Sequence, residues 1–183
     1  IGDPAPPGDG DVGGGETGGG ELIGNDPDFF WPSSNSGGWS NGGFAYDDTD
    51  GTYATTNGAN NHSYSDHGFS IPGGNVISGI VVKLEVSGST AAGTVDVELS
   101  WDGGGSWTTI KSSPTLTTAD AVRTLGSQSD LWGRTWTATE LTNPNFAVRV
   151  TGNPSSNTIS LDAIQVRVYH TAGGGGSGGG GGI

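Results

Sequence analysis

The alternation of residues that ends at Val86 constrains the fold of this chain more than any other sequence feature. Apolar residues recur at every second position from Ile80 to Val86, and Lys83 and Glu85 stand between the later ones. Successive side chains of a strand point to opposite faces, so this period of two predicts a strand with one buried and one wet face. The turn sequence PGG at 72–74 precedes it and predicts a further strand on the other side.

Short runs with the same alternation recur along the chain, separated by Gly, Pro, Asn and Asp. No helical period extends beyond a single turn. This pattern predicts an all-β chain folded as an antiparallel, jelly-roll-like β-sandwich with Gly-rich extended N- and C-terminal arms. The expected strands lie near residues 44–48, 53–56, 66–71, 76–87, 94–101, 106–111, 121–125, 145–151 and 158–169.

Two local signals add detail to this fold. The apolar positions of the last strand change from odd to even numbers near Asp162, which predicts a β-bulge there. Thr137 and Glu140 have the spacing of a capping box, which predicts a single helical turn before Leu141.

Glycine-rich segments flank the expected sandwich. They hold 19 of the 37 glycines, ten in residues 1–24 and nine in residues 173–183. Such segments have almost nothing to bury and read as arms or linkers. The sequence therefore predicts four parts: a Gly/Pro-rich acidic arm at 1–24, an aromatic and Ser/Gly connecting segment at 25–42, a β-sandwich domain at 43–171 and a polyglycine tail at 172–183.

The composition of the chain limits the classes of partner that it is expected to bind. Nineteen acidic and six basic residues give a net charge of −13, which argues against nucleic acid and anionic membrane surfaces and favours cations. There is no cysteine for disulfides or thiolate metal sites. No apolar run approaches the roughly 20 residues that span a bilayer, so no membrane insertion is expected. The chain lacks Met and begins with Ile1, which predicts a removed leader or a segment of a longer protein.

One acid-rich turn is the best metal candidate in the sequence. Asp47, Asp48 and Asp50 stand close together beside Gly51, and Asp162 on the expected bulge could complete the set. Carboxylate oxygens suit Ca²⁺, so a structural calcium ion is the cofactor this turn would hold. The alternative is a plain turn, because Asp and Gly are also the residues of which turns are made.

The octet SWDGGGSW resembles the Asp-box, a short motif of the form S-x-D-x-G-x-[ST]-W. The resemblance implies a structural hairpin closure, with the Asp side chain accepting bonds from turn amides and the Trp packed beneath it. Sialidases carry several copies of this motif and place their catalysis elsewhere, in an arginine cluster that this chain lacks. The motif positions are Ser100, Asp102, Gly104, Ser106 and Trp107.

The segments AYDDTDGTYATT, GFSIPGGNVISGIVVKLEV, SDLWGRTWT and NFAVRV…ISLDAIQVRVYHT together resemble a β-sandwich module that recurs in phage virion proteins and in bacterial surface or secreted proteins. This likeness covers about residues 43–171. The acid-rich turn and the ending LDAIQVRVY also resemble, more distantly, jelly-roll discoidin and carbohydrate-binding modules, whose members often hold a structural calcium there. Both resemblances imply an extracellular, cell-surface or virion setting, and neither implies an activity.

Two functions fit these observations. The first is a non-enzymatic structural subunit of a filament, fibre or virion appendage that assembles with copies of itself through its arms. Its expected anchors are Leu22, Ile23, Phe29, Phe30 and Trp31.

The alternative is a calcium-dependent carbohydrate-binding or adhesin module with glycans as partners. Its expected stacking residues are Trp39, Tyr46, Tyr53 and Tyr64. Enzyme activity is not expected, because His62, His67 and His170 are scattered and no acid/base pair stands out.

Overall fold

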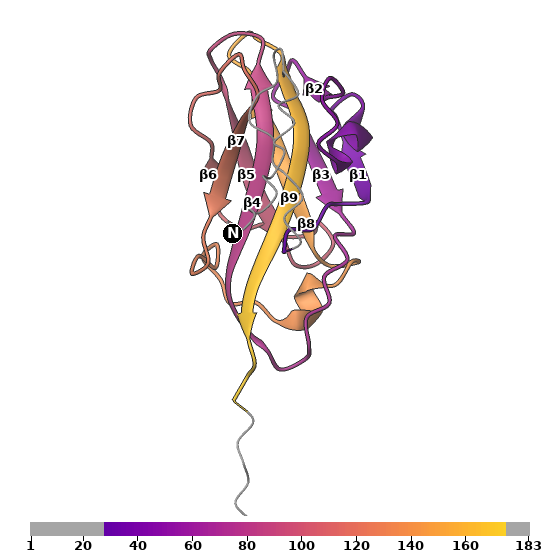
Figure 1. The fold of residues 1–183 in the computed structure, drawn as a ribbon, viewed down its shortest axis with the longest axis vertical. Coiled ribbons are helices and arrows are strands. Elements are labelled where there is room, and N and C mark those ends of the chain that lie inside the picture. The colour runs from indigo at the N-terminus through magenta and orange to yellow at the C-terminus, as the bar shows by residue number, and fades with distance from the viewer. Residues whose placement is uncertain (1–27, 175–183) are drawn as a thin grey trace, which may run out of the picture.

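A computed structural model describes residues 28–174 as a β-sandwich of two antiparallel sheets packed face to face (Figure 1). The first sheet has the strand order β1-β3-β8-β5-β6, and the second has the order β2-β9-β4-β7. The strands are β1 (Ser34–Gly37), β2 (Ala54–Thr56), β3 (Asn61–Ser65), β4 (Val76–Gly88), β5 (Thr94–Ser100), β6 (Lys111–Ser112), β7 (Ala121–Gly126), β8 (Ala147–Asn153) and β9 (Ile159–Thr171), and two short 3-10 helices are η1 (Gly42–Tyr46) and η2 (Ala138–Leu141). The expected all-β sandwich is confirmed.

The core lies between the two sheets and is built by the alternation that defines β4. Ile80, Val82, Leu84 and Val86 are completely buried. Across the sandwich they face the inward residues of the five-stranded sheet, which follow the same period of two. Those inward residues are Tyr64, Val95, Val97, Leu99, Val148 and Val150.

The longest pairing in the molecule joins β4 to β9, which run side by side along the front of Figure 1. Its register shifts where Glu85 pairs with Ala163 and Val86 pairs with Leu161. Asp162 is therefore the extra residue of a β-bulge, as the change of period predicts.

The expected helical turn is also present, as η2. Thr137 Oγ1 accepts a hydrogen bond from the Glu140 amide at 3.4 Å, and Glu140 Oε2 accepts one from the Thr137 amide at 2.8 Å. Both halves of the capping box are formed, which satisfies two amides that a helix start leaves without partners.

Five segments differ from the expectation. Of the expected strand at 106–111 only Lys111 belongs to a strand, and β3 lies between the expected strands 53–56 and 66–71. Residues 44–46 belong to η1, and residues 47–48 follow it outside any strand. Residues 66–71 lie outside the ladder because Asp66 takes a left-handed backbone angle (φ 60°) directly after β3. β1 lies inside the segment 25–42 that was expected to be a connector. Its sequence SNSG has no apolar alternation, and pairing with β3 is what makes it a strand.

Within residues 28–174, the structure contains no helix with the length and hydropathy that a membrane crossing requires.

Candidate functional site

The outer face of the five-stranded sheet carries small polar side chains in cross-strand rows. The β1–β3 register sets Ser36 opposite Ser63 and Ser34 opposite Ser65. On the next strand, β8, Arg149 lies beside Ser63. The residues that alternate with these on β3 and β8 are buried, so the serines and Arg149 belong to the outer face.

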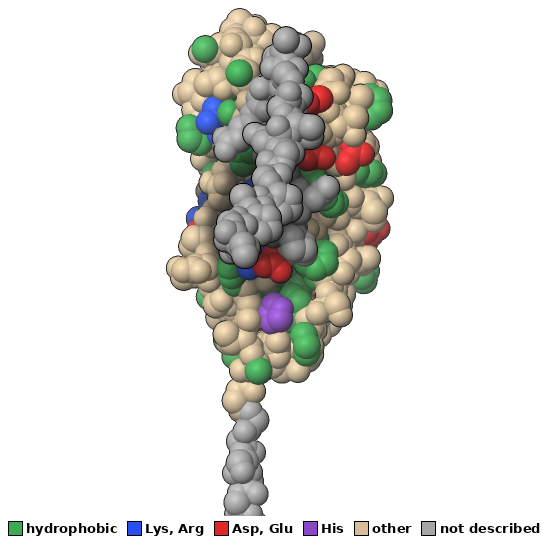
Figure 2. Space-filling view, in the orientation of Figure 1, with side chains coloured by type: hydrophobic (Ala, Val, Ile, Leu, Met, Phe, Trp, Pro, Cys, Tyr) green, Lys and Arg blue, Asp and Glu red, His purple; other side chains and the backbone are tan. Residues whose placement is uncertain are grey.

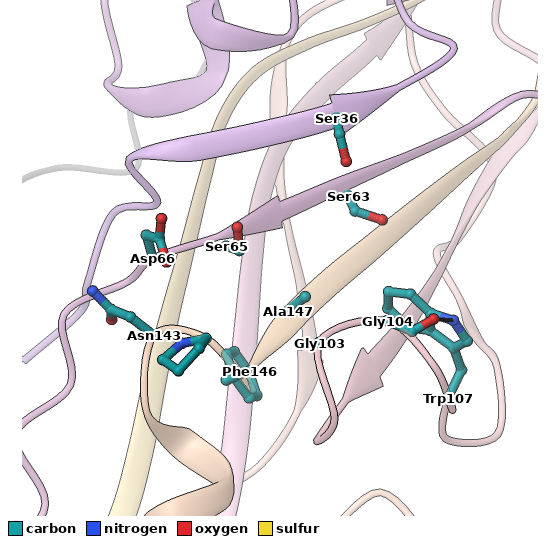
Figure 3. Close-up of a pocket in the computed structure, with 11 residues that line it drawn as sticks. Ser36, Ser63, Ser65, Asp66, Gly103, Gly104, Trp107, Asn143, Phe146 and Ala147 are labelled. Atoms are coloured by element: carbon teal, nitrogen blue, oxygen red, sulfur yellow. Dashed lines mark hydrogen bonds between the residues drawn. The ribbon is translucent and has the colours of Figure 1, made fainter.

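This face is hollowed next to the β5–β6 loop by a depression of about 370 Å³, which we call the serine groove (Figure 3). Serines of β1 and β3 form one side, and the loop that carries Trp107 forms the other. The start of β8 lies between them, and two loop residues, Asp66 and Asn143, lie at one end. Its complete lining is Ser36, Ser63, Ser65, Asp66, Gly103, Gly104, Trp107, Asn143, Pro144, Phe146 and Ala147.

The β5–β6 loop is held closed by its own side chains. Asp102 Oδ1 accepts hydrogen bonds from the Ser106 amide at 2.7 Å and from Ser100 Oγ at 3.0 Å. Ser100 Oγ in turn accepts from the Gly104 amide at 2.8 Å. The bonds from Ser106 are the main reason that the pKa of Asp102 lies below its usual value. These bonds fix a loop that Gly103 and Gly104 turn with positive φ angles of 73° and 97°.

The indole of Trp107 is fixed in this loop and supported from the sheet. Its Nε1 donates to the Gly104 carbonyl oxygen at 3.1 Å, and the Arg149 guanidinium lies 4.1 Å from the ring centroid. Glu98 Oε2 accepts from Arg149 Nε at 2.9 Å and from Nη2 at 2.7 Å. The half-buried Trp107 is therefore a preorganised aromatic wall, with a cation–π contact to its ring.

The end of the serine groove is equally well fixed. Asp66 follows β3, and its carbonyl oxygen accepts a hydrogen bond from Ser33 Oγ at 2.9 Å. Asn143 Oδ1 accepts from the Gly68 amide at 2.8 Å, which leaves the Asn143 Nδ2 group as the donor of that side chain. A carboxylate acceptor and an amide donor thus flank the same end of the groove.

The hydroxyls of the groove lack protein partners. In the part of the chain that the structure describes, Ser36, Ser63 and Ser65 make no side-chain hydrogen bond, although hydroxyls both donate and accept. The sequence analysis missed these serines. The signal was present in HSYS, where His62 and Tyr64 alternate with the two serines of β3, because this is the period of a strand with a small polar outer face.

The aromatic residues expected to stack on sugars do not line this groove. Trp39 is 5% exposed and Tyr64 is completely buried, so both belong to the core and that expectation needs correction for them. Tyr46 is half-buried and its hydroxyl accepts a hydrogen bond from Asn35 Nδ2. Tyr53 donates to Asp120 Oδ2 at 3.0 Å, and burial is the first cause that raises its pKa to about 12.

Three of the four expected metal ligands lie on the loop that follows η1, at one edge of the sandwich. Figure 2 shows acidic side chains gathered on the edge where β2 and η1 lie. Asp47 Oδ1 accepts a hydrogen bond from the Thr49 amide at 3.0 Å, the bond of an Asx turn. Asp48 and Asp50 follow on the same exposed loop. Across residues 28–174, no three Asp, Glu or His side chains are placed to hold a metal ion together.

Asp162 lies on the bulge of β9, within range of the charges of the loop acids Asp48 and Asp50. Its side chain is completely buried, and neither carboxyl oxygen has a hydrogen-bond partner among the described residues. Burial is the first cause that raises its pKa to about 7, and the charges of neighbouring acids add to it. Those neighbours are Glu85, Asp120, Asp50 and Asp48.

The aromatic residues expected to anchor assembly pack on their own domain where they are described. Phe29 is 8% exposed beneath the Lys83 ammonium, 3.9 Å from its ring centroid. Phe30 exchanges two backbone hydrogen bonds with Val166 of β9, at 2.8 and 3.0 Å. Trp31 is half-buried. The other two expected anchors, Leu22 and Ile23, lie outside the described residues.

The histidines form no acid/base pair with a carboxylate within the described residues. His67 is buried against Phe69 and Phe146, at ring-centroid distances of 5.4 and 5.5 Å, and burial lowers its pKa to about 3. It therefore stays neutral in the core. His62 bonds to Asn35 and His170 bonds to Asn75.

Comparison with known proteins gives matches among solved structures alone. No family model and no curated protein matches the sequence. A truncated AlyQ with CBM32 and alginate lyase domains is 15% identical, with a TM-score of 0.47, and the match covers 79% of this chain and 33% of that chain. A CBM4 structure is 14% identical, with a TM-score of 0.43, and covers 78% and 95%. Chitosan-binding module 1 of a chitosanase/glucanase from Paenibacillus sp. IK-5 is 19% identical, with a TM-score of 0.42, and covers 73% and 92%.

At these identities the likeness concerns the β-sandwich fold, and this chain spans about a third of the length of the AlyQ chain. By their names, these three proteins are carbohydrate-binding modules or contain one. The expectation of a self-assembling structural subunit is therefore corrected.

Proposed function

We propose that this chain is a non-catalytic, extracellular carbohydrate-binding module that holds a glycan in the serine groove. The observation that carries the proposal is the composition of the groove, in which three serine hydroxyls without partners among residues 28–174 lie beside one preorganised indole. Sugars present hydroxyls around their rings and apolar C–H faces on them. Serine hydroxyls can exchange hydrogen bonds with the former, and an indole can pack against the latter.

The groove is also preformed. Its residues come from four strands or loops that are distant in sequence, so the fold positions them before any ligand arrives. A preformed site does not have to be ordered on binding, and this lowers the entropic cost of association. The fixed loop at Trp107 and the fixed ends at Asp66 and Asn143 supply this rigidity.

The test is binding of the full chain to a panel of soluble polysaccharides by affinity electrophoresis, with the Trp107→Ala variant beside it. We expect retardation of the wild-type chain by at least one polysaccharide and a loss of roughly 10-fold or more in affinity for the variant, because one aromatic platform contributes about 1.5 kcal/mol. Phe44→Ala is the matched control, since Phe44 is an aromatic residue of η1 that is 46% exposed and does not line the groove.

A second variant separates a lost contact from a damaged loop. Ser63→Ala combined with Ser65→Ala removes two hydroxyls from the floor of the groove and leaves the β5–β6 loop intact. Thermal unfolding of each variant shows whether the fold is retained. If Trp107→Ala and the serine pair both bind as tightly as the wild-type chain, the glycan site lies elsewhere and the proposal is wrong.

A further inference from the structure

The serine groove has an unbalanced charge. Asp66 is the one charged side chain in its lining, and its carboxylate forms no ion pair with any residue between 28 and 174. The serines, glycines and amide that surround it carry no charge. An ionic group of a ligand in this groove would therefore meet a single negative charge.

The neighbouring cation cannot offset that charge for an anionic ligand. Arg149 lies beside Ser63 in the β3–β8 register, but Glu98 accepts two hydrogen bonds from its guanidinium and Trp107 covers it. Arg149 is thus neutralised within the protein. The net charge of −13 acts in the same direction over a longer range.

The backbone of Asp66 is held in place at this end of the groove. Its backbone is left-handed, with φ 60°, and the Ser33 hydroxyl bonds its carbonyl oxygen. The neighbouring Asn143 is anchored by the Gly68 amide. A ligand cation that reached Asp66 would not have to order this end of the groove first.

From this geometry we propose that the serine groove selects glycans by charge: it favours sugars that bear a protonated amine, of the glucosamine type, and disfavours uronate or sulfated sugars. The proposal rests on the glycan-binding function proposed above and adds the class of sugar. The amine of one sugar unit lies against the Asp66 carboxylate, while the indole of Trp107 holds the ring of another.

The test uses glucosamine oligomers of one length in two forms, fully deacetylated and fully N-acetylated, because only the first carries amines. Uronic-acid oligomers of the same length are the third ligand. At about pH 6 and low ionic strength the free amines are protonated. Isothermal titration calorimetry measures the affinities. We expect the deacetylated oligomer to bind about fivefold more tightly than its acetylated form, because two opposite unit charges about 4 Å apart in water attract each other by about 1 kcal/mol. The uronate oligomer is expected to bind most weakly.

Asp66→Asn tests the residue itself. Asn tolerates a positive φ, so the variant keeps the backbone of this turn. We expect it to bind the two glucosamine oligomers with equal affinity, whereas Asp47→Asn, which removes one exposed charge outside the groove, is expected to keep the fivefold preference. Added salt should reduce the preference of the wild-type chain.

The outcomes separate the two proposals. If the N-acetylated and deacetylated forms bind equally to the wild-type chain and Trp107→Ala weakens both, glycan binding in the groove stands and charge selection is refuted. If Asp47→Asn reduces the preference as much as Asp66→Asn does, net charge rather than the groove is responsible, which also refutes it. If no oligomer or polysaccharide binds, both proposals are wrong.

Discussion

The serine groove and the bulge at Asp162 both carry polar side chains on strands of the sandwich, but the first set is at least partly open to solvent and the second is buried. The groove hydroxyls are neutral, open to a ligand and not needed by the fold. The Asp162 carboxyl is ionisable and buried without a hydrogen-bond partner among the described residues. Unpartnered polar groups at a surface are a resource for binding, whereas the same groups in the interior cost stability.

Asp162→Asn probes the buried side of this contrast and has the largest expected effect. The pKa of Asp162 is about 7 in the folded chain and below 4 as a free side chain, so the folded chain holds this proton more tightly. Its contribution to stability is complete below the unfolded pKa and is lost as the pH rises through the folded pKa. The variant has no charge to bury and is expected to exceed the wild-type free energy of unfolding by on the order of 2 kcal/mol at about pH 8.

Urea titrations of both proteins across this pH range measure the difference. It should be small near pH 4, grow between about pH 4 and 7, and level off above. Asp47→Asn provides the control for loss of one acidic charge, because Asn can still accept the bond from the Thr49 amide. A stability difference that does not change with pH would show that Asp162 is not protonated by its burial.

Arg149→Ala comes next. Arg149 is half-buried, in contrast to the completely buried Asp162, and it supports the groove through Trp107. The change leaves Glu98, which is 9% exposed, without its charged partner and removes the contact with Trp107. We expect a loss of about 2 kcal/mol in unfolding free energy, in the range of hydrogen bonds to charged groups, together with weaker glycan binding. Thermal unfolding and affinity electrophoresis measure the two effects.

The double variant Glu98→Gln with Arg149→Met provides the comparison for Arg149→Ala. It removes both charges, so no carboxylate is left buried alone, and it should recover most of the lost stability. Binding should not recover to the same extent, because the guanidinium beside the indole is still missing. Recovery of both properties together would mean that Arg149 does not support Trp107.

The change of all three groove serines to Ala has the smallest effect on stability. These hydroxyls make no bond to the protein within the described residues, so the unfolding free energy should change by less than about 0.5 kcal/mol. Glycan affinity should fall nonetheless. Denaturant titration and calorimetric binding on the same preparation check both statements, and a large loss of stability would show that the serines serve the fold.

The fold was largely predictable because the core follows local rules. The alternation through β4, the bulge at Asp162 and the capping box at Thr137 are local signals, because each depends on residues that are close together in the sequence. The structure confirms all three. β1 was not predictable in this way. Its polar sequence carries no period of its own, and its partner β3 is 24 or more residues away in the chain.

The groove was less predictable than the fold. Trp107 is conspicuous in the sequence, but what makes it a groove wall is the register that sets β1, β3 and β8 beside the β5–β6 loop. Conversely, Trp39 and Tyr64 look available for a ligand in the sequence and are taken by the core, because a small sandwich needs large side chains to fill it.

The place of β9 has a consequence for synthesis of the protein. β9 is the last of the described strands in chain order, yet it lies in the interior of its sheet between β2 and β4. Until β9 has left the ribosome, no strand joins β2 to β4, and the apolar inner face of this sheet is incomplete. Completion of the sandwich must therefore wait for β9, and a product that stops before Ile159 would leave β2 without its partner strand and β4 without one of its two.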